Sequence, residues 1–394
     1  MIHHLAVFKD HRQSRSTALL FTVAGVILGA WAALIPFVKA RHAMDDGELG
    51  LFLLTMPAGV VLMNPFSVPI MHRLGTVRTS LVFLISSAIL FAGVFRMDGL
   101  TSTILTLFLA GASYSCLNVA MNTIASQLEL HAAVRIMSAC HGCWSAGAML
   151  GSALGAMLTG LGWSPFSFLV LVILLESGAA AVLYRSLSGM PEESPLQDGP
   201  SHRRRHFMIP NRALWALISI SVCVNLTEGS MTDWSSVYMQ EVVAVPEYMT
   251  GWGFSVYASF MAAGRFLGDA FINRFGSRKV LVAGGMLVSA GLGIIILLPF
   301  QATVLVGFAL VGFGVSTGSP VLYAAAAKVP GMAKGAGLAT MNTFAMIGFM
   351  GGPAVIGWMA KWFGLSFSFA IVTAVAVFWT WRAFVIRKGG LPED

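Results

Sequence analysis

The chain has 394 residues and a formal net charge of +7, and 57% of its residues are hydrophobic while only 10% are charged. A soluble globular domain carries roughly a quarter charged residues, so this composition excludes an ordinary soluble protein. With a mean hydropathy of +0.79, it indicates a chain whose main solvent is lipid. We attribute the positive charge to membrane topology and expect no nucleic-acid partner.

Twelve apolar runs long enough to cross a membrane follow one another along the chain. A helix needs about 20 residues to cross a hydrocarbon core of about 30 Å. The runs are continuous and rich in Gly, Ala and Leu, which favours helices over the short alternating strands of a β-barrel. We therefore expect an all-α integral membrane protein with spans near 17–38, 48–70, 79–95, 101–127, 137–160, 163–184, 212–240, 249–272, 279–299, 302–327, 335–360 and 365–386.

The distribution of Lys and Arg predicts the orientation of these spans. The polar start MIHHLAVFKDHRQSR lacks a small-residue cleavage site, so the first span is expected to be a retained helix. If the N-terminus is cytoplasmic, all but five of the 24 Lys and Arg residues lie on the cytoplasmic side or in its loops. We expect a protein of the inner (cytoplasmic) membrane with both termini in the cytoplasm; the five exceptions are Lys39, Arg41, Arg96, Lys361 and the intrahelical Arg265.

One polar, Pro-rich segment, RSLSGMPEESPLQDGPSHRRRH, interrupts the apolar pattern and is typical of a flexible linker. It divides the chain into an N-terminal six-helix bundle at 1–185, a cytoplasmic linker at 186–210 and a C-terminal six-helix bundle at 211–394. A shift of 201 positions aligns the halves without gaps. It pairs Gly50 with Gly251, Gly75 with Gly276, Gly111 with Gly312, Gly147 with Gly348, and Phe166, Ser167 and Phe168 with Phe367, Ser368 and Phe369.

Six helices is an even number, so both halves enter the membrane in the same direction and form a parallel repeat about an axis along the membrane normal. Two facing bundles of this kind create an interface at the bilayer midplane. The repeat therefore predicts a solute site that opens alternately to each side of the membrane.

The loop between the eighth and ninth spans, GRFLGDAFINRFGSRKVL, resembles the cytoplasmic motif of the major facilitator superfamily of secondary transporters. Asn273 stands where that motif has an acidic residue, and the first-half copy NPFSVPIMHRLGTVRTSL keeps Arg73, Gly75 and Arg78. The stretches LNVAMNTIASQLE, RIMSACHGCWSAGAMLGSALG and EGSMTDWSSVY are similar to the YbjJ-like and fucose-permease-like branches. This resemblance, over essentially the full length, implies twelve helices and a transport function, with sugars among the branch's substrates.

The charged residues of this loop are candidate gating residues. Arginines at cytoplasmic helix ends can contact the negative ends of helix dipoles and a carboxylate, and so hold one state closed. We expect Arg265 to pair with Asp269, one turn away, and Arg73, Arg274 and Arg278 to support the gate. The alternative is that these arginines only follow the positive-inside rule.

Glycines spaced four residues apart predict close helix contacts. Gly147, Gly151 and Gly155 form such a face in the fifth span, and Gly348 and Gly352 repeat it in the eleventh. We interpret them as packing surfaces and not as ligands.

Polar residues on inner spans are candidate solute ligands. Tyr114, Asn118 and Asn122 share one helix face in the fourth span, and their groups suit a hydroxylated or zwitterionic solute. For the two Asn residues, interhelical hydrogen bonding is the alternative. In the seventh span, Asn225 and Glu228 lie on a stripe with Ser221, Thr232 and Ser235.

Further candidate ligands come from the fifth and eleventh spans and from aromatic residues. His141 and Asn342 occupy equivalent positions at the shift of 201; His141 could relay protons or be a satisfied interior residue. Trp31, Trp144 and Tyr257 could stack on a solute ring or serve only in packing. Glu176 is expected to have a structural or snorkelling role.

Glu228 is the expected proton-coupling residue, with Asp233 as the reserve. Starting from the cytoplasmic end, Glu228 lies near or beyond the midplane, where a charge costs about 2.5–3.5 kcal/mol. A carboxyl that loses its water tends to hold a proton, and it could release the proton when water enters. The alternatives are a carboxyl neutralised by a fixed partner, and an Asp233 that faces another helix.

The remaining motifs argue against other classes of function. The CHGC stretch at 140–143 lacks the four convergent ligands of a zinc site, and no nucleotide-binding motif occurs. We therefore expect no cofactor, no metal and no enzyme, but a monomer in membrane lipids that moves a small organic solute, with protons as the coupling ion. Two alternatives stay open: a proton-driven exporter of amphipathic compounds, and a receptor or lipid-handling protein on the same scaffold.

Overall fold

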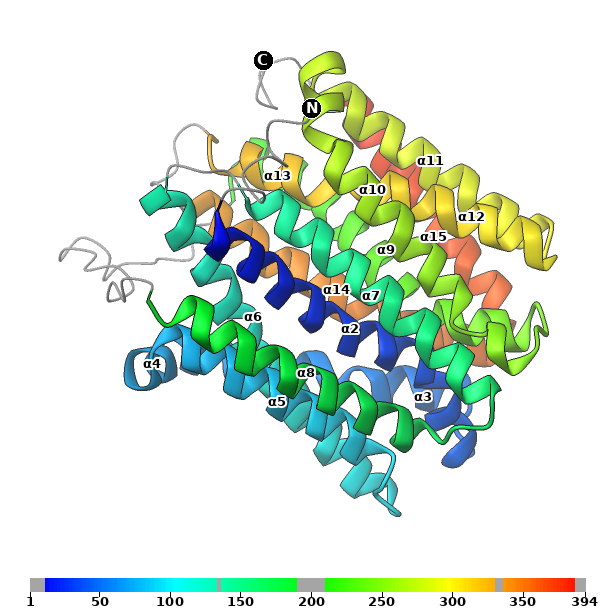
Figure 1. Cartoon of the computed structure of the whole chain (residues 1–394). Coiled ribbons are helices and arrows are strands. Elements are labelled where there is room, and N and C mark those ends of the chain that lie inside the picture. Colours follow the sequence, from blue (N-terminus) through cyan, green and yellow to red (C-terminus); the bar gives the residue numbers. More distant parts are fainter. Residues whose placement is uncertain (1–10, 133–135, 190–209, 330–335, 387–394) are drawn as a thin grey trace. The chain divides into compact units, whose positions relative to one another are not determined.

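The computed structural model describes residues 11–132, 136–189, 210–329 and 336–386. Most of the expected linker at 186–210 lies outside these ranges. All the regular structure within them is helical, and Figure 1 labels the elements.

Seven helices lie in the described residues of the first half. Capping side chains and turn residues mark the ends of several helices. The Ser164 hydroxyl accepts from the Ser167 backbone N–H at 3.1 Å and so caps the start of the sixth span. Gly75, at φ 84°, forms the turn between two spans in a conformation that favours glycine. The helices are α2 (Arg12–Arg41), α3 (Asp46–Leu53), α4 (Thr55–Leu74), α5 (Thr76–Val94), α6 (Leu100–Ala132), α7 (Met137–Gly160) and α8 (Pro165–Leu187).

The second half begins with a helix capped by Asn211, whose Oδ1 accepts from the Leu214 backbone N–H at 2.9 Å. Gly276, at φ 80°, forms the same turn as Gly75, 201 positions later. The elements are α9 (Arg212–Glu241), the short 3₁₀ helix η2 (Glu247–Met249), α10 (Trp252–Phe275), α11 (Ser277–Leu297), α12 (Gln301–Val315), α13 (Gly318–Ala326), α14 (Ala336–Phe363) and α15 (Leu365–Val385).

The twelve expected spans are present, and two of them are broken. The second consists of α3 and α4, and the tenth of α12 and α13. Within the described residues, ten spans are long and apolar enough to cross a membrane by length and composition. The other two are α7, which is rich in Gly and Ser, and α10, which carries Arg265, Asp269 and Arg274. The expected all-α membrane fold is confirmed.

The chain forms two compact units that exchange short segments. Unit 1 comprises residues 1–44, 52–197 and 245–258, and unit 2 comprises 45–51, 198–244 and 259–394. In unit 1, the Ser152 hydroxyl of α7 donates to the Gly251 carbonyl at 2.8 Å. In unit 2, Lys361 Nζ of α14 lies 2.9 Å from Asp45 Oδ2. Each unit thus contains a segment from the other half of the sequence.

Glycines bring pairs of helices into backbone contact. In unit 1, α2 lies along α7, and a Cβ added to Gly147 or Gly151 would lie 1.9 Å from the Thr22 carbonyl oxygen or 2.0 Å from that of Val26. In unit 2, α9 packs on α14 in the same way, where a Cβ on Gly348 would lie 2.7 Å from the Val222 carbonyl oxygen. The expected small-residue packing faces are confirmed, because no larger side chain fits there.

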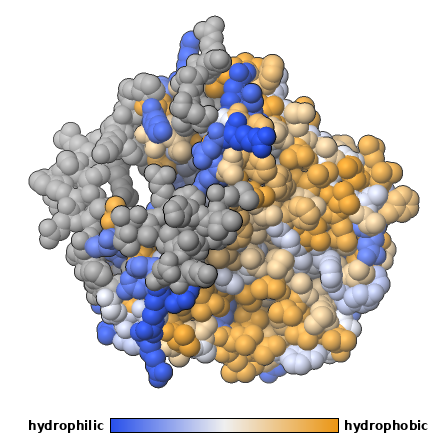
Figure 2. All heavy atoms as spheres, turned by 45° about the horizontal axis from the view of Figure 1, so that its top comes forward, coloured by the Kyte–Doolittle hydropathy of each residue, from blue (hydrophilic) through white to orange (hydrophobic). Residues whose placement is uncertain are grey.

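The outer surface is largely apolar, as a lipid-facing protein requires. Figure 2 shows broad hydrophobic areas on the face that it presents. Large side chains such as Leu62, Leu174, Met286, Trp362 and Phe384 are at least half exposed. In water this surface would promote aggregation, whereas acyl chains solvate it.

Candidate functional site

Unit 1 holds a hydrogen-bonded polar set on α6 and α7. Asn118 and Asn122 lie one turn apart on α6, and Asn122 Nδ2 donates to the Asn118 carbonyl at 2.8 Å and to Asn118 Oδ1 at 3.1 Å. His141 Nε2, on α7, lies 3.2 Å from Asn122 Oδ1. The Phe21 ring of α2 packs edge-on against the His141 ring at 5.3 Å between centroids. The structure therefore brings three of the expected solute ligands together.

Two more expected ligands form a bond between the same two helices. Trp144 Nε1 donates to the Tyr114 hydroxyl oxygen at 2.8 Å. Tyr114 lies four residues before Asn118, and Trp144 lies three residues after His141, so this pair is about one turn from the amide set. Tyr114 is buried, whereas Trp144 is half-buried.

Asn118 is the residue of this set that is most open. It is exposed, although it lies near the middle of the 33-residue helix α6. Its Nδ2 group forms no hydrogen bond within the described part of the chain, so two amide hydrogens stay free to donate. An amide at this depth is costly in lipid, which favours a position that faces water or a polar solute.

Unit 2 repeats one of these bonds with different residues. The Tyr323 hydroxyl of α13 donates to Asn342 Oδ1 of α14 at 3.2 Å. Tyr323 and Asn342 are the counterparts of Asn122 and His141 at the shift of 201, and the bond in each unit joins residues 19 positions apart. Tyr323 was not among the residues expected at the site. The shift of 201 aligns Tyr323 with Asn122, so the repeat could have identified it.

A partly buried ion pair joins α9 and α10 in unit 2. Arg265 Nη2 lies 3.3 Å from Glu228 Oε1, and the two side chains are 13% and 17% exposed. The expected pairing of Arg265 with Asp269 is wrong for this structure: Asp269 is exposed and forms no ion pair among the described residues. The Asp269 side chain is exposed, whereas Arg265 points toward α9.

The other polar residues of α9 are less closely tied to the ion pair. Asn225 Nδ2 donates to the Ser221 carbonyl at 2.8 Å, a bond within its own helix. Asp233 is half-buried and forms no hydrogen bond or ion pair within the described chain. The structure therefore leaves the reserve role of Asp233 as a prediction.

Two aromatic candidates lie in the packed interior of unit 1. Trp31 is 2% exposed and packs on Phe91 and Phe95, with ring centroids 5.4 and 6.4 Å away. Tyr257 is 1% exposed and lies 5.9 Å from the Phe254 ring. In this structure neither ring is open to a solute, which favours the packing alternative for both.

Glu176 has an environment that its sequence context did not suggest. It is 1% exposed on α8, and its two carboxyl oxygens have no hydrogen-bond partner in the described part of the chain. The snorkelling role is therefore wrong, because the side chain does not reach the surface. Its structural role stays a prediction.

The expected gating arginines make contacts at helix ends. Arg278 donates to the Phe384 carbonyl in the last turn of α15 and lies over the Phe384 ring at 5.5 Å. This is the expected contact of an arginine with the negative end of a helix. Arg274 lies over the Phe275 ring at 5.3 Å, and Arg73 is exposed. Their role in gating stays a prediction.

Comparison with known proteins agrees with this architecture. The Major Facilitator Superfamily model matches residues 17–250 and 238–393. An uncharacterized MFS-type transporter of Yersinia pestis is 32% identical over 378 residues, covering 94% of this chain and 95% of the relative. Membrane protein MosC of Rhizobium meliloti is 29% identical over 385 residues, covering 96% and 91%.

Solved structures show the same fold at low sequence identity. The nucleoside transporter NupG has a TM-score of 0.73 at 12% identity and covers 94% of this chain and 99% of its own. A bacterial homologue of the lysosomal transporter Spinster, in an inward-facing and occupied conformation, has a TM-score of 0.72 at 14% identity, covering 94% and 95%.

Apolar spanning helices that hold polar and charged side chains at mid-span are those of a multi-pass membrane protein with a functional site among them. The chain belongs to the Major Facilitator Superfamily. It is a secondary transporter and not an enzyme, and members of this family carry small-molecule solutes.

Proposed function

We propose that this transporter moves a small polar organic solute, sugar-like in its hydroxyl groups, by alternating access and couples the movement to protons. The polar set of unit 1 supports the solute class. Asn118 offers free amide hydrogens, and the linked Asn122 and His141 hold neighbouring groups in place. Donors and acceptors fixed on rigid helices suit a solute with several hydroxyl groups.

The ion pair of Glu228 with Arg265 carries the proposal of proton coupling. A charge inside a membrane protein is costly unless it is paired. When Glu228 takes up a proton, the carboxyl becomes neutral and the attraction to Arg265 is lost. Arg265 stays charged at all relevant pH values, so the contact between the two helices loses its charge attraction while the guanidinium stays cationic. Proton binding at Glu228 would in this way alter the α9–α10 contact.

The orientation belongs to the same proposal. We place both termini on the cytoplasmic side of the inner membrane, because the Lys and Arg residues concentrate there under this assignment. The proton would then enter from the outer side during uptake. Cysteine labelling of an exposed loop residue in intact cells tests this orientation.

The test of function begins with the solute. Purified protein is screened by melting temperature against sugars, amino acids, organic acids and amphipathic drugs, and the solute that stabilises it is used in proteoliposomes. We expect Glu228→Gln to abolish accumulation driven by a pH gradient while solute exchange continues. Glu241→Gln, at the end of the same helix, is the matched control and should accumulate normally.

Two results would contradict the proposal. Full pH-driven accumulation by Glu228→Gln would exclude this residue as the coupling site, and the same measurement on Asp233→Asn would then test the reserve. Stabilisation by amphipathic drugs alone would refute the polar solute and favour an exporter.

A further inference from the structure

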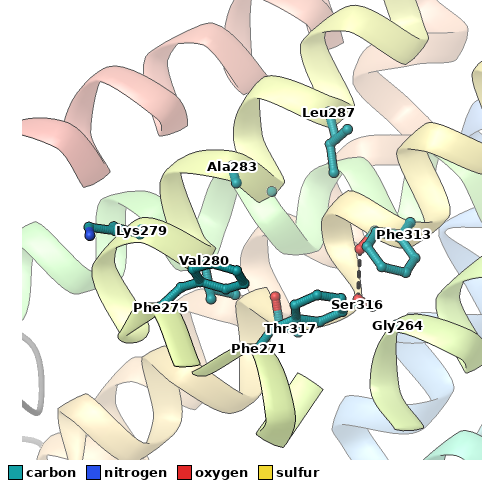
Figure 3. A pocket seen from close by; sticks show the side chains of 11 residues that line it. Gly264, Phe271, Phe275, Lys279, Val280, Ala283, Leu287, Phe313, Ser316 and Thr317 are labelled. Carbon is teal, nitrogen blue, oxygen red and sulfur yellow. Dashed lines mark hydrogen bonds between the residues drawn. The ribbon is translucent and has the colours of Figure 1, made fainter. Parts of the chain in front are cut away.

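A cavity of about 360 Å³ opens on the side of unit 2, away from the polar residues described above. It lies between α10, α11 and the break between α12 and α13 (Figure 3). Its volume is within the range of small-ligand pockets. The walls come from Phe271 and Phe275 of α10, Val280, Ala283 and Leu287 of α11, and Phe313 of α12.

The cavity is suited to an apolar chain and not to a polar solute. Its main polar wall group, the Ser316 hydroxyl, donates to the Phe313 carbonyl at 2.7 Å and is thereby satisfied. Thr317, at 9% exposure, is the other hydroxyl in the wall. Two wall residues, Gly264 and Gly284, allow close helix contacts here: a Cβ on Gly264 would lie 2.1 Å from the Ser316 hydroxyl oxygen, and one on Gly284 would lie 2.5 Å from the Gly314 carbonyl oxygen.

The cavity is open at the surface of the helices. Phe275 is 46% exposed, and Ala283 is exposed. Leu287 lies eight residues after Lys279 on α11, which corresponds to about 12 Å along the helix axis. The lining therefore extends from the helix ends inward along the direction of a membrane acyl chain.

Positive charge is concentrated at the end of the cavity. Lys279 lines it, and in Figure 3 its ammonium group points away from the aromatic rings. Lys279 forms no hydrogen bond or ion pair within the described residues, and Arg274 and Arg278 lie on the same turn between α10 and α11. Asp269 is the one carboxylate between residues 266 and 279, so cations outnumber it three to one.

We propose that this cavity is a binding site for a phospholipid with an anionic headgroup, with one acyl chain between α10, α11 and α12 and the phosphate on Lys279. Charge complementarity selects the headgroup, because the exposed Lys279 ammonium, with no ion pair among the described residues, attracts phosphate. The apolar walls select a chain and exclude a polar solute. Of all partners, a lipid is the one that the membrane always supplies at this surface.

The experiment measures lipid bound to the full-length protein in neutral detergent by native mass spectrometry. The probes are phosphatidylglycerol and phosphatidylcholine with identical acyl chains. We expect the unchanged protein to hold more phosphatidylglycerol, and Lys279→Ala to reduce that excess roughly fivefold, as expected for one lysine near an anionic surface. Lys279→Arg should keep the preference. Ala283→Phe, which fills the cavity from its exposed wall, should reduce the binding of both lipids.

The repeat supplies a matched control. Arg78 is the counterpart of Lys279 in unit 1, exposed at the start of α5, and Arg78→Ala should leave phosphatidylglycerol binding unchanged. Equal binding of the two lipids by the unchanged protein would refute the proposal without any variant. An unchanged preference in Lys279→Ala would also refute it, and displacement of the lipid by glycerol phosphate alone would indicate a site for soluble phosphate instead.

Discussion

Removing either partner of the Glu228–Arg265 pair should destabilise the protein by different amounts. Breaking a fully buried ion pair costs about 3–5 kcal/mol, and an exposed pair contributes about 0–1 kcal/mol. With side chains 17% and 13% exposed, we expect about 2–3 kcal/mol for Glu228→Gln, because it leaves a guanidinium that cannot lose its charge. Arg265→Gln should cost less, since the remaining carboxyl can take up a proton.

The assay is the apparent melting temperature in detergent at neutral pH, for both single variants and the double variant. We expect Glu228→Gln to lower it by roughly 2–4 °C, Arg265→Gln by less, and the double variant by less than the sum. Asp269→Asn is the control and should change it little, since that carboxylate is exposed. If the losses of the two single variants simply added up in the double variant, Glu228 and Arg265 would not be coupled. A larger loss from Asp269→Asn would restore Asp269 as the partner of Arg265.

The other expectations address the solute set, the helix contacts and the exchanged segment. Asn118→Ala should weaken the stabilisation of the protein by the solute. The melting temperature of the solute-free protein should stay within about 2 °C, because the Asn118 amide hydrogens make no hydrogen bond among the described residues. A loss of stability with intact solute binding would make Asn118 a structural residue. Gly151→Ala should lower the yield of folded protein, since a Cβ there would lie 2.0 Å from a carbonyl oxygen, whereas Gly178→Ala, with nothing within 4 Å, should not. The Glu48 backbone N–H and then Lys361 lower the pKa of Asp45 below its usual 3.8. The unchanged protein should therefore melt at a higher temperature than Asp45→Asn at neutral pH, and this difference should vanish as the pH falls below 3.8. A difference that grew in acid would contradict a lowered pKa.

The sequence predicted the fold well because the length of each apolar run can be read from the run itself, and the constant shift of 201 recurs over many residue pairs. The twelve spans and the glycine contacts follow from composition and four-residue spacing alone. The breaks at Leu54 and at Ser316 and Thr317 were not predicted, because neighbouring helices and not local propensity decide where a membrane helix bends.

The candidate site was predictable only for residues that lie on one face of the same helix, because helix geometry alone places their side chains together. Asn118 and Asn122 came together as their spacing required. The partner of Arg265 was not predictable from spacing: Asp269 is one turn away in sequence, but Glu228 of a neighbouring helix makes the ion pair. Tyr323 was missed for another reason: the shift of 201 pairs it with Asn122, so the repeat could have identified it, but Tyr was not considered as a replacement for Asn.

The exchange of segments 45–51 and 245–258 between the units has a consequence for dissecting the protein. Expression of residues 1–185 alone would produce a six-helix bundle that lacks the 245–258 segment against α7 and carries a displaced 45–51 segment with no α14 to receive it. We therefore expect that neither half folds stably alone, even though the sequence divides cleanly at the linker. The two halves produced as separate chains should accumulate only when they are made together, with each completing the other.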